Sequence, residues 1–188
     1  MNTVIEAILN RRSIRKYSEA PVRQEILSQI IEAGQYAPSG MNAQSWHFSV
    51  IQNREKLEAL EETVYNALNR SEDPYLKKMG ALSDFNYFYG APVLVIISNA
   101  ANSISLSPVS DAALAAGNMM LAAHALGLGS CWVHVLTRLR EEPEVREAMS
   151  ALGVPKGNVV CSALSIGYPE GPLPKAMDRR EGTVNYVF

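Results

Sequence analysis

The chain has 188 residues, of which 47% are hydrophobic and 19% are charged, a length and balance typical of one globular domain. The formal net charge of −2 argues against a protein that coats nucleic acid, because such a protein carries a basic surplus over a whole face. Cys131 and Cys161 stand in apolar surroundings, which favours buried thiols in a reducing compartment over a disulfide framework. We therefore expect residues 1–188 to form a single cytoplasmic domain.

The N-terminal half of the chain alternates helical patterns with one strand. The run Thr3-Val4-Ile5-Glu6 reads as a capping box that opens a short helix, and apolar residues between 26 and 31 have the spacing of a second helix. A loop rich in turn formers covers 37–42, and residues 46–52 alternate like a strand. Asn53 is placed to cap a helix that continues to Leu68.

The C-terminal half adds three more strands and two helices. After an irregular, aromatic stretch over 70–90, strands are predicted at 93–97, 130–135 and 159–166, with a helix over 142–152. The segment 111–126 is apolar on nearly every side, which predicts a helix buried all round that is too short to cross a membrane. The tail ends in a strand-like run at 183–187, the pattern of an arm exchanged between two copies. Four strands separated by helices predict a layered α/β or α+β structure.

The basic cluster Arg11-Arg12-Ser13-Ile14-Arg15 is the strongest local signal in the chain. Guanidinium groups stay charged and grip phosphate oxygens two at a time, so three of them in one turn indicate a phosphate site. The alternative is a basic patch that merely faces water. The sequence offers no catalytic constellation that would decide between them directly.

Several catalytic and cofactor motifs are absent from the sequence. It contains no phosphate loop of the nucleoside triphosphatases, and Gly127-x-Gly129 lacks the rest of a dinucleotide fingerprint. The three histidines show no metal-ligand spacing, so no metal is predicted, and Ser39 lies outside a nucleophile elbow. A phosphate clamp without a reactive side chain indicates chemistry supplied by a bound cofactor. FMN fits better than pyridoxal phosphate, which needs a Schiff-base lysine, and the amides of Asn42 and Gln44 can read a flavin ring.

With these motifs in order, the chain resembles the nitroreductase-like family of FMN-dependent NAD(P)H oxidoreductases. The resemblance covers almost the whole chain and rests on three segments, which are residues 11–17, 37–46 and 118–132. It implies an α+β fold with a central, mostly antiparallel sheet flanked by helices. It also implies an obligate homodimer with FMN at the interface and an exchanged C-terminal arm.

The resemblance also implies roles for individual residues. Arg11, Ser13 and Arg15 would hold the FMN phosphate and ribityl chain, with Arg12 on the phosphate or the ring edge. Asn42 and Gln44 would lie beside the ring. The other subunit would contribute Pro38, Ser39 and Gly40. A loop formed by Trp132, Val133 and His134 would pass the N5 edge, where a backbone N–H donates to N5. Lys175 and either Arg179 or Arg180 would complete the clamp, and we select Arg179.

A substrate pocket is the least defined part of this prediction. Its candidates are Met41, Phe85, Phe88 and His134. Rings in the run 85–89 could stack on a planar acceptor, or they could fill the core beside the next strand. His134 stands where many family members carry glycine, so its side chain either narrows the pocket or points to solvent.

The function implied is a reductase that uses NAD(P)H to reduce small organic acceptors such as nitroaromatics or quinones. It would work by ping-pong hydride transfer through flavin N5. No nucleic acid or membrane partner is expected. Two alternatives stay open: an FMN-binding module for storage or sensing without turnover, and a flavin-free protein whose arginines bind an anionic partner.

Overall fold

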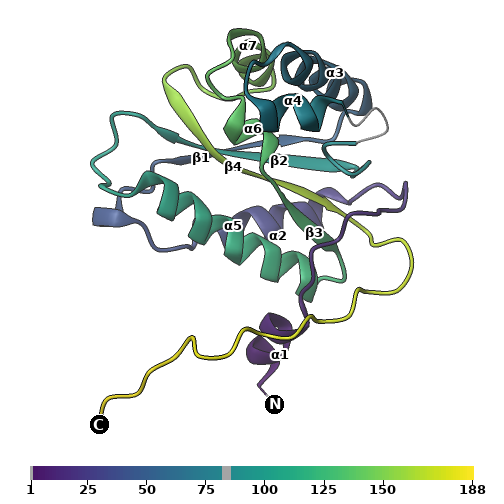
Figure 1. The fold of residues 1–188 in the computed structure, drawn as a ribbon. Helices are drawn as coiled ribbons and strands as arrows, with labels where there is room; N and C mark the ends of the chain where they lie inside the picture. The colour runs from purple at the N-terminus through teal and green to yellow at the C-terminus, as the bar shows by residue number, and fades with distance from the viewer. Residues whose placement is uncertain (1, 82–85) are drawn as a thin grey trace.

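The computed structural model describes residues 2–81 and 86–188, whose core is a four-stranded sheet (Figure 1). Its strands are β1 (Trp46–Ile51), β2 (Val93–Ala100), β3 (Gly129–Val133) and β4 (Asn158–Gly167), in the order β1-β2-β4-β3. Every neighbouring pair is antiparallel. The four predicted strands and the antiparallel α+β architecture are thus confirmed, with Val135 in a helix and not in β3.

The two central strands are apolar on both faces because helices cover the sheet on both sides. In β2 all residues from Val93 to Asn99 are buried, and Val95 lies opposite Leu164 of β4. A strand buried on both faces reads as a continuous apolar run, not as an alternation. For this reason the apolar run at 93–97 predicts a strand from the sequence alone.

The helices form one layer on each face of the sheet (Figure 1). One layer contains α2 (Gln24–Gln35) and α5 (Pro108–Ala125), and the other contains α3 (Arg54–Arg70), α4 (Pro74–Gly80), α6 (Val135–Arg138) and α7 (Pro143–Ala151). Each layer has its own cluster of buried side chains, with Met119 of α5 in the first and Leu136 of α6 in the second. Short helix η1 (Gly40–Asn42) and helix α1 (Thr3–Asn10) lie at the periphery. No helix among the described residues is long and apolar enough to span a membrane.

Helix ends follow the capping chemistry, with one correction to the sequence prediction. Helix α1 is capped by Asn2, whose side chain accepts from the Val4 N–H at 2.9 Å, and not by Thr3. Asn53 caps α3 as predicted. Helix α4 was missed within the stretch treated as irregular, although Asp73 before Pro74 is a typical start signal.

Helix α5 is not buried all round, contrary to the prediction. One face, including Ala112, Ala116 and Met119, packs against the sheet and is fully buried. Val109 is 55% exposed and Leu114 is 48% exposed on other faces. Helix α1 buries none of its residues, and its apolar side chains also face outward. The single chain therefore leaves extensive apolar helix surface uncovered.

The C-terminal tail leaves the body of the molecule (Figure 1). Just before the tail, the Glu170 N–H donates to the Lys16 carbonyl at 3.0 Å. All residues from 171 to 188 are exposed, and 183–187 form no strand in this chain. The predicted strand is thus wrong for one copy, because high β-propensity yields a strand only where an edge is available to pair with.

Residues 11–17 lie along the outer side of β3. The Ile14 N–H donates to the Ser130 carbonyl at 3.0 Å, and Ser13 forms an isolated parallel bridge with Ser130. The approach is close because Gly129 has no side chain: a Cβ there would lie 2.6 Å from Ile14 Cγ1 and 2.7 Å from Ile14 Cβ. Gly129 therefore sets how tightly the basic cluster docks on the sheet.

Replacing Gly129 with alanine should force the basic segment away from β3. We expect Gly129→Ala to lower the free energy of unfolding by about 1–3 kcal/mol, the usual cost of overpacking a core. Urea denaturation measures this. Ile14→Ala removes two of the three clashing carbons, so the double variant should lose less stability than the two single changes added together. If the stability losses of the two single variants simply add in the double variant, the contact between residues 14 and 129 does not limit how closely the basic segment approaches β3.

Candidate functional site

The basic segment alternates buried anchors with outward side chains. Ile14 is 5% exposed and Tyr17 is 7% exposed, whereas Arg15 between them is exposed. The Tyr17 hydroxyl donates to the Ile14 carbonyl at 2.7 Å, and burial raises the pKa of this phenol, so it stays protonated. This local order presents Arg15 on the surface next to β3.

Two of the polar groups around this segment lack a hydrogen-bond partner among the described residues. The Arg11 Nη1 atom is buried and unpaired, and so is the Ser130 hydroxyl, whose residue is 2% exposed. Buried polar groups are nearly always satisfied in native structures. A bound anion would supply acceptors for such donors, so these orphaned atoms support a phosphate site. Ser130 was not predicted from the sequence, since nothing but the bridge to Ser13 distinguishes it.

Arg12 differs from its neighbours. Its Nη1 donates to the carbonyls of Leu9 and Arg11 at 2.7 and 2.8 Å, which ties the side chain to the C-terminal end of α1. The Nε of Arg12 is buried without a partner among the described residues. Arg12 therefore closes the end of α1 and keeps one donor for a ligand.

Tyr89 is a site residue that the sequence prediction did not select. The Arg15 guanidinium lies 5.8 Å from the centre of the Tyr89 ring. Hydrogen bonding to Tyr89, with a further contribution from Cys131, raises the pKa of Arg15. Tyr89 has φ 61°, a left-handed conformation that is strained for an aromatic residue and is typical of functional positions. The strain is a tertiary property, and the sequence carries only the pair Tyr89-Gly90 as a signal.

Phe88, predicted as a pocket residue, lies in the core. Its side chain is 2% exposed within the cluster of the α3 layer. Its backbone is held from both sides, since its N–H donates to Glu61 Oε1 at 3.0 Å and its carbonyl accepts from Ser165 Oγ at 2.9 Å. Phe85 lies outside the described residues. Phe88 thus fills the core, which was one of the two roles considered for the rings of residues 85–89. The ring that contacts the basic cluster is that of Tyr89.

The second predicted half of the site is the loop 38–44. Met41, Asn42 and Gln44 all have positive φ, between 46° and 56°, so the loop stores backbone strain. Buried Asp111 at the start of α5 holds it: Oδ1 accepts from the Gly40 N–H at 2.9 Å, and Oδ2 accepts from Ser105 Oγ at 2.6 Å.

The loop directs its polar side chains outward. Gln44 Nε2 donates to Asn42 Oδ1 at 2.9 Å, and the Gln44 N–H donates to Ser39 Oγ at 3.1 Å. Asn42 and Gln44 line a hollow of about 730 Å³ together with neighbouring residues that include Trp46. Pro38 and Met41 are exposed at its margin. The predicted binding loop is therefore accessible and preshaped.

One chain does not bring the two halves together. Loop 38–44 is fastened to the N-terminal end of α5 through Asp111, whereas the basic segment lies on β3, which follows the C-terminal end of α5 (Figure 1). A helix of 18 residues is about 27 Å long. Hydrogen bonds join the loop residues to one another and to Asp111, so Asn42 and Gln44 lie with Pro38, Ser39 and Gly40 and not with Arg15.

The remaining predicted residues lie at the end of β3 and in the tail. Trp132 is half-buried, Val133 is buried, and His134 is exposed and precedes α6. The His134 carbonyl accepts from Thr137 Oγ1 at 2.7 Å, which fixes the turn while its imidazole faces outward. Lys175 and Arg179 are exposed in the tail, where every residue from 171 to 188 is exposed.

Comparison with known proteins gives consistent matches over most of the chain. The family model described as "Nitroreductase family" matches residues 8–168. An FMN reductase [NAD(P)H] of Bacillus subtilis is 31% identical over 194 residues, covering 99% of this chain and 74% of the relative. A nitroreductase structure with bound FMN from Bacteroides fragilis is 39% identical, covers both chains completely and has a TM-score of 0.93. A second FMN-bound nitroreductase, from Desulfitobacterium hafniense, is 25% identical with a TM-score of 0.85, covering 100% of this chain and 99% of that one.

Glu61, whose carboxylate accepts from the Phe88 N–H, should affect how the stability of the protein depends on pH. Burial raises the pKa of Glu61, so the folded state disfavours its ionisation, and stability falls as pH rises above the ordinary glutamate value of about 4.3. Glu61→Gln keeps an oxygen that accepts from Phe88. Relative to wild type, this variant should gain stability from pH 4 to pH 7, as measured by urea denaturation.

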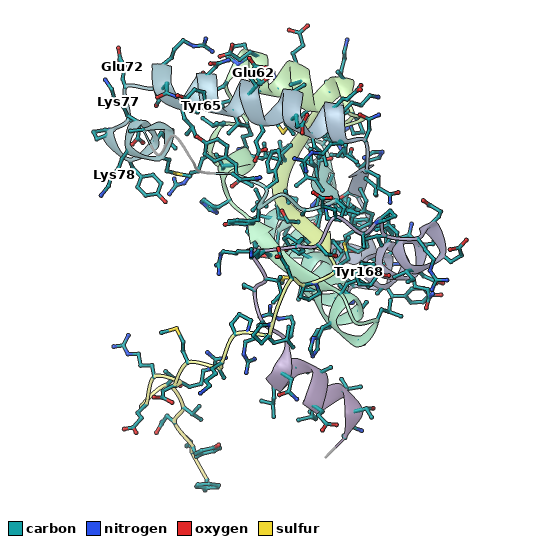
Figure 2. The ribbon with its side chains drawn as sticks, turned by 90° about the vertical axis from the view of Figure 1, so that its right-hand side faces the viewer. Glu62, Tyr65, Glu72, Lys77, Lys78 and Tyr168 are labelled. Atoms are coloured by element: carbon teal, nitrogen blue, oxygen red, sulfur yellow. The ribbon has the colours of Figure 1, made fainter. Side chains whose placement is uncertain are left out.

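Glu62→Gln is the matched control, because this substitution removes the same charge from an exposed residue of α3 (Figure 2). Its stability difference from wild type should change little over the same range. Parallel curves for the two variants would contradict the raised pKa of the buried Glu61.

Proposed function

The chain belongs to the nitroreductase family and is an FMN-dependent NAD(P)H oxidoreductase, and we propose that two copies of it build each FMN site and reduce small organic acceptors there. The observation that carries this proposal is the separation of the two binding segments at opposite ends of α5. A site that needs both must draw them from two chains.

The residues present fit FMN. The unpaired Arg11 Nη1, the Ser130 hydroxyl and the exposed Arg15 form a group of donors suited to a phosphate. Arg11, Ser13 and Arg15 would hold the phosphate and ribityl chain, with Arg12 contributing its free Nε. Such charge-assisted contacts are the stronger hydrogen bonds in proteins.

The partner would supply loop 38–44. Its Pro38, Ser39 and Gly40 would pack on the ring, and the outward amides of Asn42 and Gln44 would donate to or accept from the ring edge. The strained backbone is preshaped, so little ordering entropy is lost on binding. Met41, 75% exposed, would lie at the acceptor pocket.

The uncovered apolar surfaces support the dimer. Exposed side chains on α1, α5 and the tail include Ile8, Leu114 and Phe188, and such surfaces usually mark association. A tail whose residues 171–188 are all exposed in one chain is suited to wrap a second copy. There Lys175 and Arg179 would add positive charge to the phosphate clamp.

FMN, when bound, supplies the redox chemistry, taking a hydride from NAD(P)H and passing two electrons to an acceptor. The protein would bind and orient FMN: the backbone of Trp132, Val133 and His134 would run past its reactive edge, and the guanidinium of Arg15 would offset the negative charge of its phosphate. Each turnover consumes one NAD(P)H and one proton from solvent. Donor and acceptor would use the same pocket in turn, with nitroaromatics or quinones as acceptors.

The absorbance spectrum of the purified protein tests this function. We expect a flavin band that NADH or NADPH bleaches without oxygen and that an added nitroaromatic or quinone restores. A flavin band that no nicotinamide bleaches would identify a storage or sensing module instead. A colourless protein that cannot be reconstituted with FMN would contradict the proposal.

A mixed dimer tests whether the site is shared. Arg15→Glu should weaken FMN binding by about 10- to 100-fold, since a charge-assisted contact is worth roughly 1.5–3 kcal/mol. Asn42→Asp keeps the left-handed backbone that Asn and Asp tolerate and places a negative charge at the ring. Each homodimer should therefore lose FMN, as measured by fluorescence after desalting.

Coexpression of the two variants with different tags isolates the mixed dimer. If each site joins the basic segment of one chain to the loop of the other, one site is doubly damaged and the second is intact. We expect half the wild-type FMN content. FMN-free mixed dimers would show that both segments come from one chain. Arg23→Glu, at an exposed arginine before α2, serves as the charge control.

A further inference from the structure

Arg138 lies one helical turn beyond the reactive-edge loop. It closes α6, which begins directly after His134, and the Arg138 N–H donates to the His134 carbonyl at 3.3 Å. Val135 and Leu136 are buried, so α6 is fixed to the sheet. Residues four apart on a helix lie on one side, and both His134 and Arg138 are exposed.

The Arg138 guanidinium lies over an exposed aromatic ring. Its Cζ is 6.0 Å from the centre of the Tyr75 ring, on α4, and Tyr75 is 58% exposed. Two elements far apart in the sequence thus meet at this point. A cation on an aromatic face is held in place without using its hydrogen-bond donors, so the planar fork remains available.

No carboxylate neutralises Arg138 within the described part of the chain. The ion pairs found there involve Lys16, Arg54, Arg70 and Arg140. Asp73, the acidic residue nearest to Tyr75, accepts from the N–H groups of Tyr75 and Leu76 as the cap of α4.

The neighbouring helix adds positive charge. Lys77 and Lys78 are exposed in the last turn of α4, at the outer end of the molecule (Figure 2). Glu72 precedes the helix and lies next to Lys77 (Figure 2). The three cations Arg138, Lys77 and Lys78 still outnumber the two carboxylates of Glu72 and Asp73.

We propose that Arg138 and Tyr75 form a subsite for the anionic group of a planar substrate. This inference rests on the proposed function, because it is the assigned role of residues 132–134 that places the subsite beside the reactive edge. A guanidinium fork pairs with a carboxylate or phosphate through two parallel bonds, and the Tyr75 ring under the guanidinium holds that fork in place.

Two sources can bring such an anion to this position. One is the carboxylate of an aromatic acceptor, and the other is a phosphate of the nicotinamide donor. The two share their chemistry at Arg138 and differ in the half-reaction that they affect. Donor and acceptor kinetics therefore separate them.

The test compares Arg138→Gln with wild type on matched acceptors, 4-nitrobenzoate and the uncharged 4-nitrobenzamide. We expect about a tenfold loss in kcat/KM for the acid alone, the effect of one charged hydrogen-bonding contact at an exposed site. A loss confined to the rate of anaerobic reduction by NADH or NADPH would assign the subsite to the donor phosphate. If Arg138→Gln and wild type have the same rates with both acceptors and both nicotinamides, the proposal is overturned.

Three further measurements keep the result specific. Tyr75→Leu should reproduce a weaker form of the same loss, because it removes the platform and not the charge. Arg146→Gln, at an exposed arginine of α7, should change nothing. FMN content should stay at the wild-type level in all three variants.

Calorimetric titration with benzoate gives a readout that does not depend on turnover. Benzoate binding that Arg138→Gln abolishes supports the subsite even in a protein that holds no FMN, a result that would sink the proposed function alone. Benzoate that binds wild type and Arg138→Gln equally overturns the subsite while leaving the reductase assignment untouched.

Discussion

The one-sided packing of α5 is the constraint on which the rest of the molecule depends. Its buried face, with Ala112, Ala116 and Met119, fixes the helix to the sheet. Its N-terminal Asp111 then holds loop 38–44, and the chain beyond its C-terminal end enters β3, on which the basic segment docks. Because the helix is packed on the sheet, the two segments stay at its opposite ends within one chain.

The basic segment illustrates how packing turns a charge cluster into a specific site. Ile14 and Tyr17 are buried, Gly129 admits the close approach to β3, and Tyr89 holds Arg15. Each of these contacts comes from a different part of the chain. Their combined effect is to orient the guanidinium donors, and the ion pairs among the described residues involve none of the segment's three arginines. The Arg11 Nη1 atom, buried there without a partner, is costly unless an anion binds.

Most of the fold could be predicted from sequence because its signals are local. Strands β2 and β4 are continuous apolar runs, and Asn53 is a side-chain cap read directly from its position. The errors arose where the deciding partner is distant. The apolar pattern of α5 indicated burial on all sides, but the single chain covers one face, and the tail at 183–187 has strand propensity without a neighbouring edge. Phe88 and Tyr89 are neighbouring aromatic residues, but Phe88 is buried in the core whereas Tyr89, with a left-handed backbone, lies at Arg15.

The sequence by itself determined most of the element types and the basic cluster, because helical periodicity, capping and clustered arginines act over a few positions, and it left the class open between α/β and α+β. The antiparallel α+β class and the candidate roles of the residues in both binding segments came from the resemblance of three segments to a known family. The tertiary structure decided that these segments lie at opposite ends of α5, that Ser130 and Tyr89 join the basic cluster, and that Arg138 stacks on Tyr75. Such contacts join residues separated by tens of positions, and their geometry depends on the packing of the whole sheet and both helix layers, which no local pattern encodes.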